Sequence, residues 1–332
     1  MFDLKSLDKK DARLALRVYN FSRTELGVDL RGESLVLAVS GGADSSAMFL
    51  MFRALRDYLG LKLFAAHLDH ALRPTSAEEA LTVRELCKYF QVPLSSRRLP
   101  IADLAAEKHI GLEEAGRTAR YSFFEEVRQK HGANWILTAH HLGDLAEDIL
   151  LRLIRGAGWP GIGGMPAVRG KIIRPLLLTE KQELLYLLRR QGISWLEDRS
   201  NQSLDYKRNR IRLEILPLLI KENPGLLRNM RKLWVSARQD EICWQEIWDK
   251  LIGHQSGALF FKRKDLLGLP KAARLKLYAI SIKDLGGQAL ANNLHALDHA
   301  FLSGSQKTIQ LPGFISAHTE TDCLRFVLNT VY

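Results

Sequence analysis

The feature that most constrains the fold is a short apolar run that ends in a glycine-containing turn. Residues 35–39 (LVLAV) are too few for a helix of their own, so they predict a buried strand. The turn reads Ser40-Gly41-Gly42-Ala43-Asp44-Ser45, and a helical pattern begins within it. Glycines permit a tight turn and a close backbone approach. Free amide groups and the helix dipole together form an anion site at such a turn, and a phosphate group suits it.

This turn is not a Walker loop, because the sequence contains no GxxxxGK[ST] pattern. Its pattern, SGGxDS, resembles the pyrophosphate loop of the ATP pyrophosphatase family, which cleaves ATP into AMP and pyrophosphate. The resemblance implies that ATP is bound by the six turn residues, which are Ser40, Gly41, Gly42, Ala43, Asp44 and Ser45. We expect Ser40 and Ser45 to donate hydroxyl hydrogen bonds to phosphate oxygens.

Asp44 lies where the helix begins and has two interpretations. Aspartate is a common N-terminal cap of a helix. It is also a suitable ligand for Mg²⁺ that bridges ATP phosphates, since Mg²⁺ takes a few carboxylates together with phosphate oxygens. The preceding Ser-Gly-Gly favours the magnesium role, and both roles can hold at once.

Length and charge set the class of protein. The chain has 332 residues, enough for two domains. Lys and Arg total 48 against 37 Asp and Glu, so the net charge of +11 suggests a polyanionic partner. Between Arg189 and Arg238 there are twelve basic and five acidic residues, which leaves +7 in that window. Such clustering favours nucleic acid over a uniformly solvated surface.

The cysteines and the hydropathy pattern indicate the cellular compartment of the protein. Cys87, Cys243 and Cys323 form no CxxC pair, so they predict neither a zinc ribbon nor a disulfide framework. The first residues, MFDLK, lack the apolar core of a signal peptide, and no apolar run approaches membrane-spanning length. We therefore expect reduced thiols, a cytoplasmic protein and no membrane partner.

Short apolar runs alternate with longer amphipathic segments, which predicts βαβ units and a parallel sheet. We expect strands at 34–40, 62–68, 92–98 and 134–139, and helices at 44–58, 76–90, 112–131 and 142–154. The predicted fold class is α/β, and the loop resemblance implies an adenine nucleotide alpha-hydrolase-like architecture. Asn223-Pro224-Gly225 is a strong break. We place a catalytic domain at 1–222 and a smaller, mainly helical domain at 223–332.

Three polar clusters follow predicted strands, at 40–45, 67–73 and 140–147. The carboxyl ends of parallel strands meet at one edge of the sheet, where ligands bind, so we expect these clusters to converge. His67, His70 and His140 are interpreted as contacts to the nucleotide. A zinc site built from these residues and His141 is the weaker alternative, because the sequence offers no cysteine ligands beside them.

Acidic and basic side chains in the next segments are candidates for the chemistry. Asp144 and Glu147 are three residues apart and share one face of the helix after the fourth strand. They can bind Mg²⁺, hold a substrate ammonium group or act as a base; simple pairing with the helix dipole is the alternative. Arg117, on the preceding helix, can stabilise a leaving phosphate group, and a salt-bridged surface helix is the alternative there.

The basic tract contains Tyr206-Lys207-Arg208-Asn209-Arg210-Ile211-Arg212. Aromatic and amide side chains interleaved with arginines favour RNA, which proteins recognise by stacking and by contacts to splayed single-stranded bases. A solvated basic helix is the alternative. The residues interpreted as RNA-binding are Arg199, Asn201, Tyr206, Arg208, Asn209 and Arg212.

The ordered motifs resemble the tRNA(Ile)-lysidine synthetase family, a bacterial branch of the pyrophosphate-loop ATPases. The matching segments are SGGADS (40–45), HLDHALR (67–73), EEAGRTARYSFF (113–124), TAHHLGDLAEDILLRLIRGAG (138–158), RPLL (174–177), EDRSN (197–201) and YKRNRIR (206–212). Residues 225–332 match only loosely. The chain departs from the family pattern at Gly143, where a second acid is common, and at Leu145 and Asp148, where Gln and Thr are common.

The resemblance implies ATP-dependent ligation of free L-lysine to carbon 2 of the wobble cytidine of tRNA(Ile) with a CAU anticodon. An adenylated cytidine forms with loss of pyrophosphate, and the ε-amino group of lysine then displaces AMP. The implied catalytic residues are Asp44, Arg117, Asp144 and Glu147, and the C-terminal domain is implied to contact tRNA. The oligomeric state is not given by the sequence, and a homodimer is one option.

Two other functions compete with this one. A tRNA thiolase of the same fold also adenylates a carbonyl group, but it then needs catalytic cysteines or an iron–sulfur cluster, against which the lack of a CxxC pair speaks. A non-catalytic RNA-binding protein that retains the loop is a candidate from a different class. An assay for pyrophosphate release that depends on both tRNA and lysine distinguishes the three functions.

Overall fold

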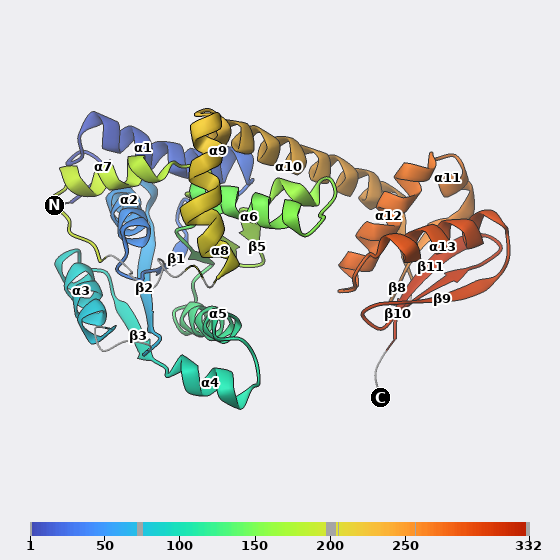
Figure 1. Cartoon of the computed structure of the whole chain (residues 1–332), viewed down its shortest axis with the longest axis horizontal. Helices are drawn as coiled ribbons and strands as arrows, with labels where there is room; N and C mark the ends of the chain where they lie inside the picture. The colour runs from blue at the N-terminus through green and yellow to red at the C-terminus, as the bar shows by residue number, and fades with distance from the viewer. Residues whose placement is uncertain (1, 72–75, 197–203, 205, 256, 330–332) are drawn as a thin grey trace. The chain divides into compact units, whose positions relative to one another are not determined.

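The computed structural model describes residues 2–71, 76–196, 204, 206–255 and 257–329. The chain divides into two compact units, Met1–Val235 and Ser236–Tyr332, which we call the first and second units (Figure 1). The division falls within helix α10 (Leu226–Leu251) rather than at the predicted break near Asn223. The Asn-Pro-Gly sequence instead separates α10 from helix α9 (Leu216–Glu222).

A six-stranded sheet forms the centre of the first unit, in the order β3-β2-β1-β4-β6-β5. The bounds are β1 Ser34–Ala38, β2 Lys62–Asp69, β3 Leu94–Arg98, β4 Trp135–Leu137, β5 Val168–Arg169 and β6 Ile172–Ile173. All neighbouring pairs are parallel except β5 with β6. The chain runs outward from β1 to β2 and β3, then returns to place β4 on the other side of β1. That reversal is the point at which open α/β sheets bind ligands.

Helices cover both faces of this sheet (Figure 1). The helices whose apolar residues join one core are α1 (Lys9–Asn20), α2 (Ala43–Leu59), α3 (Ser76–Tyr89) and α7 (Lys181–Arg190). The other face is packed by α4 (Ile101–Glu107) and α5 (Leu112–Lys130). The parallel α/β class and the four main strands were predicted, whereas the short helix α4 was not.

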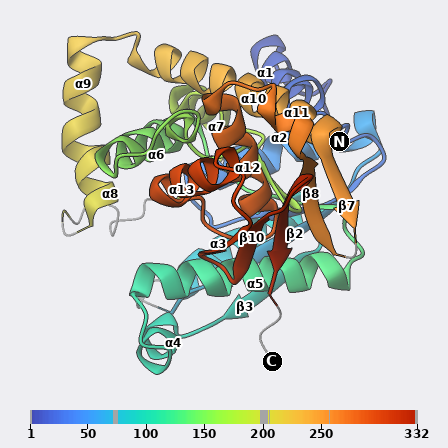
Figure 2. The ribbon, with the colours of Figure 1, turned by 90° about the vertical axis from the view of Figure 1, so that its right-hand side faces the viewer.

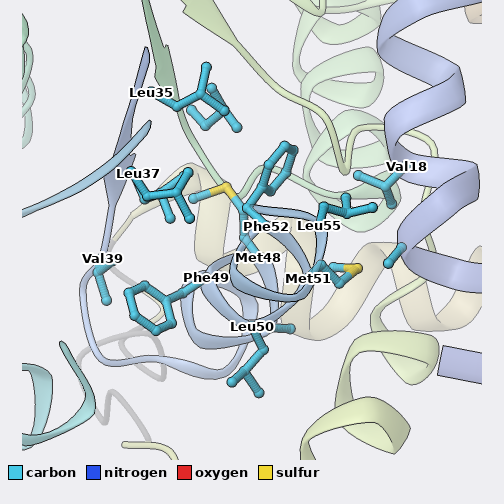
Figure 3. Packing of buried hydrophobic residues seen from close by; sticks show 14 of the residues in the cluster. Val18, Leu35, Leu37, Val39, Met48, Phe49, Leu50, Met51, Phe52 and Leu55 are labelled. Atoms are coloured by element: carbon cyan, nitrogen blue, oxygen red, sulfur yellow. The ribbon is translucent and has the colours of Figure 1, made fainter. Parts of the chain in front are cut away.

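The alternation of side chains along β1 explains why it is buried on both faces. Leu35, Leu37 and Val39 join the core with α2, and Val36 joins the core with α5. Successive strand residues point to opposite faces, so a continuous apolar run is what a central strand of a parallel sheet requires. Figure 3 shows Leu35 and Leu37 of β1 and the following Val39 against Met48, Phe49 and Phe52 of α2.

A further apolar core lies around α6 (Leu142–Ile154) in the first unit. Leu145 and Ile149 of α6 pack in one cluster with Ile211 and Leu216. Ile211 and Leu216 belong to a continuous basic segment, which comprises α8 (Lys207–Arg210), a π-helix (Ile211–Ile215, η4) and α9. This packing fixes the basic tract against α6.

The second unit is built on a five-stranded antiparallel sheet in the order β7-β8-β11-β10-β9 (Figure 2). The strands are β7 Ile252–Gln255, β8 Ala258–Lys262, β9 Lys307–Leu311, β10 Ile315–Thr319 and β11 Cys323–Leu328, and the helices are α11 Arg263–Leu267, α12 Lys271–Asp284 and α13 Ala291–Leu302. Tyr278, Phe261, Phe301 and Phe326 fill the core. The prediction of a mainly helical domain is wrong in that it missed this sheet, whose strands have no regular βαβ spacing.

None of the helices in the described ranges combines the length and apolarity needed to cross a membrane.

The two ends of α2 allow the turn at Gly41 to be tested. Gly41 and Gly60 both have positive φ, +87° and +67°, but only at Gly41 would an added Cβ approach other atoms, 3.1 Å from Leu196 Cδ1. We expect Gly60→Ala to lower the free energy of unfolding by about 1 kcal/mol through left-handed strain alone. Gly41→Ala should cost more, because contact adds to strain. Urea unfolding measures both, and equal losses would show that the contact is unimportant.

Candidate active site

The turn between β1 and α2 is held in shape by its own serines. The backbone N–H of Ser40 donates to Ser45 Oγ at 3.1 Å, and that hydroxyl donates to the Gly42 carbonyl at 3.0 Å. Among the described residues no side chain caps α2 at Gly42. The first amides of α2 are therefore available to an anion, with the helix dipole behind them.

Two other segments donate hydrogen bonds to the turn and to the residue before it. The N–H of Leu196 donates to the Gly41 carbonyl at 3.1 Å, which joins the segment after α7 to the turn. Nδ1 of His67, at the end of β2, lies 2.9 Å from the Val39 carbonyl and donates to it. His67 Nε2 is buried, and no described residue bonds to it. With the proton on Nδ1, Nε2 is a buried acceptor at the end of β2 rather than a surface group.

Asp44 is the carboxylate that the turn presents. Its Oδ2 lies 3.6 Å from His141 Nε2 and 3.6 Å from Lys181 Nζ. Burial raises the pKa of Asp44, but His141 and Lys181 outweigh burial and bring the pKa below its ordinary value. Oδ1 is buried, and none of the described groups bonds to it. An ionised carboxylate with one buried, unpaired oxygen suits a cation such as Mg²⁺.

His141 joins this carboxylate to helix α6. As the N-cap of α6, its Nδ1 accepts a hydrogen bond from the Gly143 N–H at 2.9 Å, so the capping ring carries its proton on Nε2. Asp144 Oδ2 accepts from the His141 backbone N–H at 2.9 Å and completes the cap. A Cβ on Gly143 would lie 2.7 Å from His141 Cε1. Glycine is therefore needed at 143 for this ring position, which gives a physical reason for the departure from the family pattern.

The acids of α6 are bound by the arginines of the basic segment. Arg208 Nε donates to Glu147 Oε2 at 2.9 Å and its Nη2 to Asp144 Oδ1 at 3.3 Å. Arg212 Nε donates to Glu147 Oε1 at 2.5 Å and its Nη2 to Asp144 Oδ1 at 3.0 Å. Glu147 is buried and Asp144 largely so, with 14% of its side chain exposed, and the arginines are about a third exposed. We call these four residues the arginine–carboxylate network.

This network sets the protonation states nearby. Burial raises the pKa of Asp144, but His141, His140 and Arg208 outweigh burial and lower the pKa to about 2. Burial lowers the pKa of His140 to about 4, with Arg174 and Arg208 acting in the same direction. At neutral pH Asp144 is a charged carboxylate with little affinity for a proton, and His140 is neutral.

Helix α5 approaches the same edge of the sheet. The ring of His70, after β2, lies against Gly116, where a Cβ would come within 3.1 Å of it. The guanidinium of Arg117 stacks 5.4 Å from the centre of the Tyr121 ring. Burial lowers the pKa of Arg174, and Tyr121 partly offsets this. Arg117 is exposed and is not joined to the network by any contact within the described part of the chain.

The structure thus joins Asp44 of the turn through His141 to the helix that carries Asp144 and Glu147. His140 interacts with Asp144, His67 bonds to Val39 before the turn, and His70 lies against Gly116 of α5. Of the residues interpreted as RNA-binding, Arg208 and Arg212 lie in the network, Tyr206 is exposed, Asn209 is half-buried, and Arg199 and Asn201 lie outside the described residues. No three or more His, Cys, Asp or Glu side chains in the described ranges are grouped to hold a metal ion, so the zinc alternative has no ligand set there.

Sequence reasoning did not assign three residues of this site. His141 was considered only as a zinc ligand, although its place before an acidic first turn was a capping signal. Arg174 lies in the RPLL segment, is buried, and donates to the Pro166 carbonyl at 2.8 Å. Lys181 opens α7 and carries no local signal, because only the packing of α7 on α2 brings it to Asp44.

The chain is similar in sequence and in fold to known proteins. The PP-loop domain family matches residues 15–219. A protein of Nitratidesulfovibrio vulgaris described as tRNA(Ile)-lysidine synthase is 43% identical over 305 residues, which cover 84% of this chain and 87% of that protein. The chain belongs to the tRNA(Ile)-lysidine synthase family. A second member, from Geobacter sulfurreducens, is 34% identical over 90% of this chain and 65% of its own length.

Solved structures agree with the fold of this lysidine synthase family member. The U34-tRNA thiolase NcsA from Methanococcus maripaludis superposes with a TM-score of 0.54 at 16% sequence identity, covering 68% of this chain and 80% of that one. At that identity the likeness concerns the fold alone. The predicted family and α/β fold are confirmed.

The lowered pKa of Asp144 predicts a specific acid dependence. A carboxylate with its pKa below the unfolded value stabilises the fold above that value and loses its contribution as the pH falls through the folded pKa. The stability difference between wild type and Asp144→Asn should therefore shrink between about pH 4 and about pH 2. Urea titrations across this range measure it, with Asp148→Asn, which breaks the Asp148–Arg152 pair on the same helix, as control. A difference independent of pH would contradict the prediction.

Proposed function

We propose that this chain ligates free L-lysine to carbon 2 of the wobble cytidine of tRNA(Ile) with a CAU anticodon, and that it acts in the cytoplasm. The observation that carries the proposal is the meeting of an uncapped SGGADS turn with two buried acids and two arginines at one edge of the sheet. Family membership supports the reaction class. ATP first adenylates the carbonyl oxygen at carbon 2, pyrophosphate leaves, and the lysine ε-amine displaces AMP.

The turn provides the nucleotide side of this reaction. The first amides of α2 supply donors for a triphosphate. The hydroxyls of Ser40 and Ser45, which bond within the turn and contact each other at 3.1 Å, can turn to phosphate oxygens when ATP binds. Asp44 is the residue that would hold Mg²⁺, and the ion supplies charge neutralisation of the phosphates. Donors fixed before the substrate arrives stabilise developing charge without reorganisation.

Asp144 and Glu147 provide the amine side. Two buried carboxylates attract an ammonium group, and the free lysine amine has a pKa near 10.4, so lysine arrives charged. Asp144, with its pKa lowered to about 2, is a poor proton acceptor. Its role is therefore to hold a cation rather than to act as the base. An arriving ammonium competes with Arg208 and Arg212 for the same oxygens.

The RNA side is proposed to be the segment that carries Tyr206, Arg208 and Arg212. Tyr206 is 46% exposed at the start of α8, where an aromatic ring can stack on a splayed base. Arg208 and Arg212 remain about a third exposed while they bind the acids. A phosphate or base can therefore reach them from the solvent side. The second unit is proposed to add tRNA contacts.

The cysteines disfavour the thiolase alternative. Cys87 is the one cysteine in the first unit's sequence, and burial raises the pKa of its thiol to about 12, which keeps it protonated and unreactive. Cys243 and Cys323 belong to the second unit, whereas the SGGADS turn belongs to the first.

The proposed reaction predicts multiple-turnover pyrophosphate release that requires ATP, tRNA(Ile) and lysine together. A coupled pyrophosphate assay with each component omitted in turn measures it. Asp44→Ala should abolish release while gel-shift affinity for the tRNA is kept, because the phosphate side alone is lost. Release without lysine but with a sulfur donor would favour a thiolase, and no release with any combination would favour a non-catalytic RNA-binding protein.

Substitution of the acids tests the amine site separately. Asp144→Asn and Glu147→Gln should each raise the lysine KM by about 10-fold or more, the usual cost of losing a charged hydrogen bond. Asp148→Asn, which removes a carboxylate on the same helix that pairs with Arg152 at 2.7 Å, should leave the lysine KM unchanged. Wild-type kinetics in both network variants would exclude these acids from lysine binding.

A further inference from the structure

The phosphate loop of this chain contains no lysine, yet a lysine from another helix reaches it. Lys181 Nζ lies 3.6 Å from Asp44 Oδ2, although 137 residues separate the two in sequence. The lysine side chain is 54% exposed. Asp44 is the residue at which the proposed magnesium and triphosphate meet. A cation at this point would attract the negatively charged phosphates directly.

Packing, rather than the ion pair, places Lys181 there. Leu184, Leu187 and Leu188 of α7 are fully buried in one cluster with Met48 and Leu55 of α2. The N–H of Glu180 donates to Glu183 Oε2 at 3.3 Å and orders the first turn of α7. The first turns of α2 and α7 therefore lie beside each other, and the lysine is presented at the phosphate end of α2.

Other cations near Asp44 are held by stronger contacts. His141 is fixed by the cap of α6, with Nδ1 bonded to the Gly143 N–H. Arg212 is bound to Glu147 at 2.5 Å. Among the described residues Lys181 has one partner, Asp44, at a distance longer than a hydrogen bond. An exposed pair of this kind contributes little to stability, so the ammonium can exchange to another anion at little cost.

We infer that Lys181 supplies the cation that the loop itself lacks and binds the β- and γ-phosphates of ATP. The inference rests on the proposed function. Asp44 would hold Mg²⁺ as well as pair with Lys181, and the phosphates would offer the ammonium a partner of higher charge. As pyrophosphate leaves, negative charge grows on its bridging oxygen, and a lysine point charge stabilises it. Lys181 touches substrate and is thus a catalytic residue.

Nucleotide binding tests this inference independently of turnover. The probes are α,β-methylene-ATP with Mg²⁺, which keeps the β- and γ-phosphates, and AMP, which has neither. Lys181→Met should weaken binding of the analogue about 10- to 100-fold, the range for a lost charged hydrogen bond. AMP affinity should not change. Lys181→Arg should retain most of the analogue affinity, because it keeps the charge.

Lys62→Met is the matched control, since Lys62 is exposed at the start of β2, at the opposite edge of the sheet. It should bind both ligands as wild type does. Unchanged analogue affinity in Lys181→Met, or equal losses for AMP and the analogue, would overturn the inference while wild-type pyrophosphate release still upheld the proposed function. A wild-type chain that binds no analogue and releases no pyrophosphate would overturn both.

Discussion

The strand-to-helix turn at Gly41 and Gly42 is the constraint on which the rest of the site depends. The chain must leave a strand buried on both faces and enter a helix within a few residues, and a positive φ at Gly41 makes this possible. The same geometry leaves the first amides of α2 without side-chain caps. Support then comes from distant segments, with Leu196 bonded to the Gly41 carbonyl and His67 to the Val39 carbonyl. The turn is thus both a folding requirement and the proposed binding surface for ATP.

The second organising force is the balance of charge around α6. Two buried carboxylates would be costly alone, and two arginines compensate them through hydrogen bonds with good geometry. This explains why the basic tract packs against α6 rather than extending freely into solvent. It also explains the low pKa of Asp144, because neighbouring cations outweigh the effect of burial. A site of this kind is suited to binding cations and unsuited to proton transfer at neutral pH.

Much of this arrangement could be predicted from local patterns. The apolar period along residues 35–39 and the SGGADS turn predict β1, the loop and the start of α2, because all three depend on neighbours in sequence. The meeting of Asp44 with His141 follows from strand order, since β1 and β4 are adjacent and parallel. By contrast, the pairing of Arg208 with Glu147 joins residues 61 apart and depends on how η4 packs on α6. Lys181 is similar. The antiparallel sheet of the second unit was missed although buried and more exposed residues alternate along β9 and β11.

Two arginines of the basic segment have competing partners, which are the acids of α6 and the proposed RNA. Arg208 directs Nε and Nη2 at the two acids, so a tRNA phosphate that takes these two donors competes with the acids. If a phosphate takes either arginine, each acid keeps only one of its two arginine partners, and another cation is favoured in place of the lost one. The ammonium of lysine is such a cation, and it is the other substrate of the proposed reaction. Under the proposed function, loss of an arginine to RNA would favour lysine binding at the acids, and the network would couple the two substrates through a single pair of carboxylates.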